Sequence, residues 1–402
     1  MRLRSFMRSL SVLSALSAVS VSSVLCTAAA TLPAVAETGA RTGTGAGAGA
    51  EAGAGAGAEA GAGVGAGVGG ETGASAFPRL GWDVKQTGVT SRLRGLSPVS
   101  RDVVWASGSE GTVLRTADGG RSWSDVGPPG TEALQFRDVE ALGPREAVVL
   151  SIGEGADSRV YRTDDAGRTW AETFRNDEPR AFYDCMAFFD REHGLAMSDP
   201  VDGRFRILST GDGGRSWRVL PSDGMPAALP GEAGFAASGQ CLTTSGERDV
   251  WLATGGADRS RVFHSRDRGL TWTVSDTPIP AADPARGVFA LAFRGPRHGI
   301  AVGGDYRPDQ QSPMAAALTR DGGRTWRPAA SAPPAYRSGV TWLPFPPFAA
   351  VAVGPSGSDV TLTSGRTWTT FDTGSFDTVS CTLRAGCWAS GEQGRVARLR
   401  LG

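Results

Sequence analysis

The sequence predicts an all-β fold: a seven-bladed β-propeller over residues 77–402, closed by an N-terminal strand that completes the last blade. Three observations support this prediction. An eight-residue motif occurs six times, each copy ends in a tryptophan, and the residues between copies form short runs typical of β-strands. The closing tryptophans recur about every 50 residues, a period that suits one four-stranded blade and is too long for a leucine-rich or ankyrin repeat.

The repeated octet has the chemistry of a β-hairpin turn. Its aspartate can accept backbone N–H groups within the loop, and the glycine two residues later supports a positive φ. The Ser/Thr-Trp pair then starts the next strand, with the indole against apolar surface. The copies are TADGGRSW (116–123), TDDAGRTW (163–170), TGDGGRSW (210–217), SRDRGLTW (265–272), TRDGGRTW (319–326) and TLTSGRTW (361–368). The structural aspartates are Asp118, Asp165, Asp212, Asp267 and Asp321, and the sixth copy has Thr363 instead.

The strands between the octets predict seven units rather than six. Each unit reads as strand A, a turn, strand B, a loop, strand C, the octet and strand D. After Trp368 the chain continues with GSFDTVSCTL, CWASGEQG and RVARLRL, which supply strands A, B and C of a seventh unit. The run LGWDVKQTG at residues 80–88 precedes the first unit and is free to supply the missing fourth strand. Such closure removes the open sheet edges.

The N-terminal residues predict export. Arg2, Arg4 and Arg8 precede an apolar stretch from Leu10 to Leu25, and a small-x-small site ends at Ala36, so residues 1–36 read as a secretory signal peptide cleaved near Ala36. A transmembrane anchor is the alternative, but the stretch is short and interrupted by serines. We therefore expect a secreted, extracellular or cell-envelope protein. Residues 37–76 are rich in Gly and Ala and bury too little to offset their ordering entropy, which predicts a disordered linker.

Composition excludes several classes of function. The 41 Lys+Arg balance the 41 Asp+Glu, so we expect neither a nucleic-acid partner nor stable membrane insertion. Lys85 is the only lysine, and it lies outside any phosphate-loop or Schiff-base context. Three histidines (His193, His264 and His298) are too few for a histidine-rich metal centre, and we expect no Ser-His-Asp triad. No Gly-rich motif opens a helix after a strand, so no cofactor and no metal are expected.

The octet resembles the Asp-box, or bacterial neuraminidase repeat, whose pattern is S/T-x-D-x-G-x-S/T-W. The run RHGIAVGGD at 297–305 is similar to the equivalent run of the photosystem II assembly-factor family and its non-photosynthetic bacterial relatives, and this similarity covers residues 80–402. Some of those relatives are labelled oxidoreductases, but no residue here supports such chemistry. The resemblance implies a non-catalytic binding or assembly propeller, expected as a monomer, whose ligand is a protein or a glycan.

A glycoside hydrolase is the alternative function, because sialidases also carry Asp-boxes and other glycosidases use a pair of carboxylates. The fragment FRIL at 205–208 differs by one residue from the FRIP element of sialidases. It lies before the third octet, however, whereas a sialidase has this element before the first. A sortilin-like peptide receptor is a further alternative, although no transmembrane segment follows the propeller.

Four cysteines follow the predicted signal peptide, and in an exported protein they are expected to pair. Cys381 and Cys387 flank the A–B turn of unit seven and can face each other across that hairpin. Cys185 and Cys241 occupy the same level of strand A in units three and four, so we predict a second disulfide between them. Two buried thiols are the alternative for this second pair.

The loops predict where a ligand binds. All octets join strands C and D and so lie on one face, which places the B–C loops on the opposite face beside the central channel. These loops carry carboxylates and arginines able to form a polar pocket. The ligand-binding candidates are Asp199, Asp202, Arg204, Asp305, Tyr306, Arg307, Asp359, Glu392 and Arg395. Candidates for the pocket floor, on the inner strands, are Arg94, Arg137, Asp184 and Asp377. The alternative is a solvated ring of self-paired charges, each pair worth about 0–1 kcal/mol.

Overall fold

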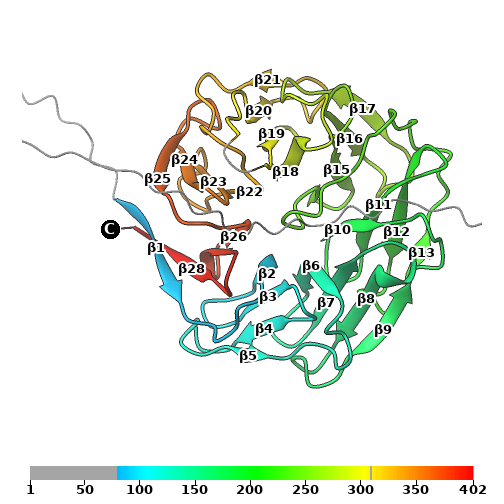
Figure 1. Cartoon of the computed structure of the whole chain (residues 1–402), viewed down its shortest axis with the longest axis vertical. Helices are drawn as coiled ribbons and strands as arrows, with labels where there is room; N and C mark the ends of the chain where they lie inside the picture. The colour runs from blue at the N-terminus through cyan, green and yellow to red at the C-terminus, as the bar shows by residue number, and fades with distance from the viewer. Residues whose placement is uncertain (1–78, 308–309, 402) are drawn as a thin grey trace, which may run out of the picture. The chain divides into compact units, whose positions relative to one another are not determined.

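The propeller consists of seven antiparallel four-stranded sheets arranged around a central channel (Figure 1). The computed structural model describes residues 79–307 and 310–401. The predicted signal peptide (1–36) and linker (37–76) lie outside these residues. A single turn of 3₁₀ helix, η1 (Gly155–Asp157), follows strand β7. In the described part of the chain no helix is long and apolar enough to cross a membrane.

The strands of blades 1 to 6 follow the chain from the inner strand A to the outer strand D. Blade 1 contains β2 (Leu93–Pro98), β3 (Val104–Gly108), β4 (Val113–Thr116) and β5 (Ser124–Asp125), and blade 2 contains β6 (Gln135–Ala141), β7 (Ala147–Ile152), β8 (Arg159–Thr163) and β9 (Ala171–Arg175). Blade 3 contains β10 (Tyr183–Phe188), β11 (Gly194–Val201), β12 (Arg204–Thr210) and β13 (Arg218–Val219), and blade 4 contains β14 (Leu242–Ser245), β15 (Asp249–Ala253), β16 (Arg261–Ser265) and β17 (Thr273–Asp276). Blade 5 contains β18 (Arg286–Arg294), β19 (His298–Asp305), β20 (Ala316–Thr319) and β21 (Arg327–Pro328), and blade 6 contains β22 (Gly339–Trp342), β23 (Ala350–Gly354), β24 (Gly357–Thr361) and β25 (Thr369–Asp372).

Blade 7 is closed by the N-terminal strand, as predicted. It consists of β26 (Thr378–Thr382), β27 (Gly386–Ser390), β28 (Val396–Leu401) and β1 (Leu80–Lys85). The antiparallel pairing runs from Leu80 opposite Leu401 to Lys85 opposite Val396, and Figure 1 shows the blue β1 beside the red β28. Two distant parts of the chain therefore share one sheet, and the exposed edge that β28 would otherwise present is paired.

The octets form the predicted C–D turns. In the first copy, Asp118 Oδ1 accepts the backbone N–H of Ser122 at 2.9 Å, and Oδ2 accepts its hydroxyl at 2.6 Å. These hydrogen bonds hold the pKa of the Asp118 carboxyl well below its usual range. In the degenerate sixth copy, Thr363 Oγ1 accepts the backbone N–H of Thr367 at 2.9 Å. The turn therefore keeps its main backbone bond without a carboxylate.

The octet tryptophans join neighbouring blades. Trp123 packs edge-on against Trp388 of blade 7 with ring centres 6.3 Å apart, and Trp170 packs in the same way against Trp105 of blade 1 at 6.4 Å. Trp105 and Trp388 are completely buried. The blade interfaces are thus filled by large aromatic side chains, which hold the inner strands in a fixed ring around the channel.

Both predicted disulfides are present. Cys381 and Cys387 are directly opposite each other in the β26–β27 ladder, with Cα atoms 4.0 Å apart. Cys185 and Cys241 join blades 3 and 4, with Cα atoms 6.0 Å apart.

Candidate functional site

A β-bulge recurs at the same place in four inner strands. In β2, β6, β10 and β18 the pairing with strand B skips one residue. The skipped residues are Arg94, Arg137, Asp184 and Phe289. A bulge redirects its extra side chain, and all four of these side chains line one pocket of about 430 Å³ at the channel mouth. The other lining residues are Arg92, Phe182, Asp199, Gly234, Phe235, Ala236, Ala237, Tyr306, Tyr336, Pro355 and Asp377.

The floor of this pocket is a segment that crosses the channel. Residues 233–240, here called the plug, belong to the connection between β13 and β14. At its end, the Gln240 side-chain amide donates to the backbone oxygens of Val340 at 3.2 Å and Val379 at 3.0 Å, and its oxygen accepts the N–H of Val340 at 3.0 Å. Blade 4 is thereby tied to blades 6 and 7 across the channel. The pocket is consequently blind rather than a through-channel.

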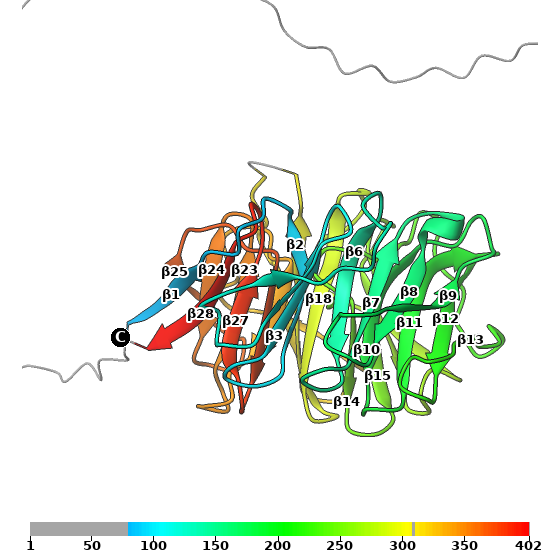
Figure 2. The ribbon, with the colours of Figure 1, turned by 90° about the horizontal axis from the view of Figure 1, so that it is seen from below.

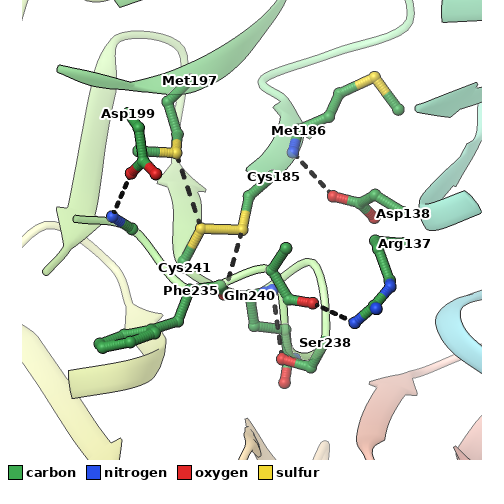
Figure 3. Close-up of a disulfide and its surroundings, with 12 residues drawn as sticks. Arg137, Asp138, Cys185, Met186, Met197, Asp199, Phe235, Ser238, Gln240 and Cys241 are labelled. Atoms are coloured by element: carbon green, nitrogen blue, oxygen red, sulfur yellow. Dashed lines mark hydrogen bonds between the residues drawn. A yellow bond between two sulfur atoms is a disulfide. The ribbon is translucent and has the colours of Figure 1, made fainter. Parts of the chain in front are cut away.

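Local geometry and the Cys185–Cys241 disulfide fix the plug (Figure 3). Gly239 has a φ of +74°, and a Cβ there would lie 2.5 Å from Asp138 Oδ1, so only glycine fits. Asp138 itself accepts the backbone N–H of Met186 at 2.7 Å. Burial raises the pKa of Asp138 to about 7.

Two arginines lie on the floor of the pocket. Arg137 donates to the backbone oxygen of Ala236 at 2.9 Å, and Arg94 donates to that of Ala237 at 3.3 Å. Neither guanidinium forms a salt bridge within residues 79–307 and 310–401. Burial lowers the pKa of Arg137 to about 10 and also lowers that of Arg94. A guanidinium group nevertheless keeps its proton in proteins, so both side chains are cationic. Each therefore offers positive charge and spare N–H donors to the pocket.

Arg92, the third arginine, is already neutralised. It forms a two-pronged pair with Asp377, with both N–O distances at 2.7 Å, and Glu392 lies 3.3 Å away. This pairing raises the pKa of Arg92. Asp377 and Glu392, both predicted site residues, therefore hold Arg92 in place at the pocket wall.

A pair of carboxyl groups lies on the blade 3 side. Asp184 is buried, and Asp199 of β11 lines the same pocket. Asp199 Oδ1 also accepts the N–H of Gly234 from the plug at 2.7 Å. Burial, and then the charge of Asp199, raise the pKa of Asp184 well above its usual range, and burial raises the pKa of Asp199 to about 6.

The opposite wall is aromatic. Phe235 of the plug stacks on Phe289 with ring centres 3.9 Å apart, and Phe289 meets Tyr336 edge-on at 4.7 Å and Tyr306 at 6.1 Å. Tyr306 is 52% exposed and stands at the rim. The pocket thus combines unpaired positive charge at its floor with a preformed aromatic wall, an arrangement that suits an anionic group carried next to an apolar one.

Six of the predicted site residues meet in this pocket: Arg94, Arg137, Asp184, Asp199, Tyr306 and Asp377. The rest are placed elsewhere, largely in pairs. Asp305 is buried and accepts from Arg286 at 2.9 Å and Arg307 at 2.5 Å. Asp202 pairs with Arg180 at 2.8 Å on the surface.

Asp359 differs most from its predicted position. We expected it in the loop before strand C, but it lies within β24, where it is fully buried and paired with Arg337 at 2.5 Å. The buried arginine needs this partner, which explains why the carboxylate is not at the rim. Arg204 donates to the backbone oxygen of Ser222 at 3.0 Å, and Arg395 lies over the Phe376 ring at 4.7 Å.

The plug was not predicted from the sequence, and of the aromatic wall only Tyr306 was. Phe289 could have been found, because it occupies the same repeat position as Arg94 and Arg137. Its apolar side chain does not match the charged pattern from which the site was predicted. Among the described residues, no group of three or more His, Cys, Asp or Glu side chains is arranged to hold a metal ion.

Fold and site together define a seven-bladed β-propeller with a blind, charged and aromatic pocket at its channel mouth. Among solved structures, the chain is similar to YCF48 bound to D1 peptide, with a TM-score of 0.54 and 14% identity over 81% of this chain and 98% of that one. It is similar to YCF48 from Cyanidioschyzon merolae, with a TM-score of 0.57 and 14% identity over 79% and 98% of the two chains. The Pan2 WD40 domain of Neurospora crassa has a TM-score of 0.52 and 13% identity over 77% and 89%.

The predicted resemblance to photosystem II assembly-factor propellers is therefore confirmed at the level of the fold. Sequence identities of 14% establish a shared fold and nothing finer. No protein-family model matches the chain, and no curated protein does either.

Proposed function

We propose that this protein is an exported, non-catalytic binding propeller of the assembly-factor type, and that it binds a protein or glycan ligand in the channel-mouth pocket. One observation carries the proposal: Arg94 and Arg137 present charge without a carboxylate partner at the floor of a blind pocket that has an aromatic wall. Unpaired charge in a partly buried site is costly, and an anionic ligand group offsets that cost.

The ligand is expected to reach the floor with an end or a side chain, because the plug closes the channel beneath it. A carboxylate next to an aromatic or aliphatic group matches the lining, as in an acidic peptide or an acidic glycan. A peptide is favoured because a propeller of similar fold is known in a peptide complex. Export is supported by the predicted signal peptide and by the two disulfides, which persist in oxidising compartments.

The glycosidase alternative would rest on the pair Asp184 and Asp199. A glycosidase needs one carboxyl free to protonate the leaving group and a second free to act as base or nucleophile. Here Asp184 is buried and Asp199 accepts the N–H of Gly234 from the plug at 2.7 Å, which argues against the pair in these roles.

The test is a pull-down with the full chain from cell-envelope extract, run beside a glycan-hydrolysis screen. Arg94→Gln with Arg137→Gln should weaken capture of the partner at least about thirty-fold, since losing a buried charge contact costs 2 kcal/mol or more. Arg259→Gln is the matched control, because Arg259 is exposed and does not line the pocket. Turnover of a glycoside would favour the enzyme.

The arginines also hold the plug, so a second variant separates binding from folding. The Tyr306 side chain is half exposed at the rim and forms no hydrogen bond among the described residues, so Tyr306→Ala should keep the melting temperature and still weaken binding. Unchanged capture by both variants would contradict the proposed pocket.

A further inference from the structure

The octet face of blades 5 to 7 carries a one-sided charge, although the whole chain is neutral. The A–B turns and octets of this sector (294–298, 319–327, 342–349, 361–368 and 382–386) contain a single acidic residue, Asp321, and seven arginines. These arginines are Arg294, Arg297, Arg320, Arg324, Arg327, Arg366 and Arg384, and all except the half-buried Arg294 are exposed. We call this sector the basic face.

The positive charge of the basic face is not compensated locally. Asp321 is occupied within its octet, where it accepts the N–H of Thr325 at 3.0 Å and the hydroxyls of Thr325 and Thr319 at 2.7 and 2.8 Å. None of the seven arginines forms a salt bridge in the part of the chain that the structure describes.

Blades 2 to 4 differ on this same face. There the A–B turns and octets also carry carboxylates, and three of their arginines pair with those of the adjacent blade: Arg191 with Glu146, Arg215 with Asp164 at 3.2 Å and Arg268 with Asp190 at 3.9 Å. The excess of arginine over carboxylate is therefore a property of the basic face, whereas single octet arginines without a salt bridge, such as Arg121 and Arg168, also occur in other described blades.

Large apolar side chains project from the same sector. Phe345 and Phe348, in the A–B loop of blade 6, are 76% and 43% exposed, and Leu383 in the A–B turn of blade 7 is 76% exposed. Two hydrogen bonds hold this A–B loop against its neighbours. The backbone N–H of Ser364 in the octet donates to the Phe348 backbone oxygen at 2.9 Å, and the Arg294 side chain donates to the Leu343 backbone oxygen at 2.6 Å. The two prolines between the phenylalanines restrict the backbone, so the rings are held outward.

We propose that the basic face docks onto the surface of an anionic phospholipid membrane. Arginines near such a surface are attracted to lipid phosphates, and apolar side chains beside them can enter the headgroup layer. The exposed apolar side chains are separated from one another and lie among arginines. This arrangement suits the lipid headgroup layer, which accepts both apolar and cationic side chains at the same depth. The core of a protein interface is instead depleted of charge.

This docking is peripheral and independent of the proposed ligand pocket. The pocket opens on the B–C face and the basic face is on the A–B and C–D face, the two ends of the blades seen edge-on in Figure 2. A membrane-docked propeller therefore keeps its pocket open to the aqueous side.

The test measures partitioning of the full chain between buffer and phosphatidylcholine vesicles with or without 30% phosphatidylglycerol, at the lipid concentration that half-saturates the wild-type protein. Arg324→Gln with Arg366→Gln should reduce partitioning into the anionic vesicles by about ten-fold or more, since each basic residue near the surface contributes about five-fold. The matched control is Arg121→Gln with Arg168→Gln, which changes the same octet position in blades 1 and 2 and should stay within two-fold.

The exposed apolar side chains supply a second readout. Phe345→Ser with Leu383→Ser changes two side chains that are each 76% exposed and should also reduce partitioning, with an unchanged melting temperature. Residues 1–78 are common to all variants, so differences between variants report the basic face. Equal loss in the control variant, partitioning that ignores phosphatidylglycerol, or retention only on an acidic protein or polyanion column would overturn the membrane assignment.

Discussion

Replacing Gly239 with alanine tests the packing of the plug against the channel wall. Gly239 has a φ of +74°, and the added Cβ would lie 2.5, 2.6 and 2.8 Å from Oδ1, Cγ and Oδ2 of Asp138. The left-handed backbone costs about 1–2 kcal/mol for alanine. Displacing the buried Asp138 carboxyl, which accepts the Met186 N–H at 2.7 Å, costs roughly 1–3 kcal/mol more. The expected loss of unfolding free energy is therefore about 3 kcal/mol.

Gly246→Ala is the matched control. Gly246 also has a positive φ, of +64°, but nothing lies within 4 Å of the position of an added Cβ. Alanine there should therefore lose only the free energy that the left-handed backbone conformation costs. Urea unfolding of both variants, followed by tryptophan fluorescence, measures the difference. A loss for Gly239→Ala no larger than for Gly246→Ala would show that the plug does not pack on Asp138, and the blind pocket would then lose its support.

Two further predictions concern the disulfides and the buried carboxyl pair. Replacing the cysteines of Cys185–Cys241 by serine should lower the free energy of unfolding by about 4 kcal/mol, and the same change in Cys381–Cys387 by about 2 kcal/mol, because the two disulfides close loops of 56 and 6 residues. Urea unfolding midpoints measure these losses. Equal losses for the two variants would contradict the chain-entropy argument. Because burial raises the pKa of Asp184, the folded state binds more protons than the unfolded state above about pH 4, so stability should fall as pH rises toward neutrality. Asp184→Asn should therefore reduce the decrease in melting temperature between pH 4.5 and 7.5. An unchanged decrease would show that Asp184 does not have a raised pKa in the folded state.

The repeat made the scaffold predictable from sequence. The octets fix the C–D turns, and the leftover strands after Trp368 require a partner, so closure by residues 80–85 follows from counting strands. The repeat also located part of the site, since Arg94, Arg137 and Asp184 share one register position in their strands. Equivalent positions in a repeat share backbone geometry, which is why these predictions transferred from one blade to the next.

The plug could not be predicted because it lies outside the repeat. Gln240 bonds to Val340 and Val379, which are 100 and 139 residues away, and no local pattern in GFAASGQC indicates those partners. The pairing of the charged residues at the rim could not be predicted either. Asp305 and Glu392 can face a ligand only if no arginine of the protein pairs with them. Which arginines lie within reach is set by the folded structure and cannot be seen in the sequence. In the structure Asp305 is buried and paired with Arg286 and Arg307, and Glu392 is paired with Arg92.

The plug also bears on how the pocket binds. Its floor is bonded to blades 1, 2 and 3 through Arg94, Arg137 and Asp199, and to blades 6 and 7 through Gln240. A floor held from five blades leaves little conformational entropy to lose when a ligand arrives, and preorganised donors yield more of their interaction energy as affinity. The two floor arginines already spend one donor each on plug carbonyls, so their orientation is set before binding. We therefore expect a ligand to enter without rearranging the inner strands, and recognition to depend on whether its anionic end fits the space that the plug leaves.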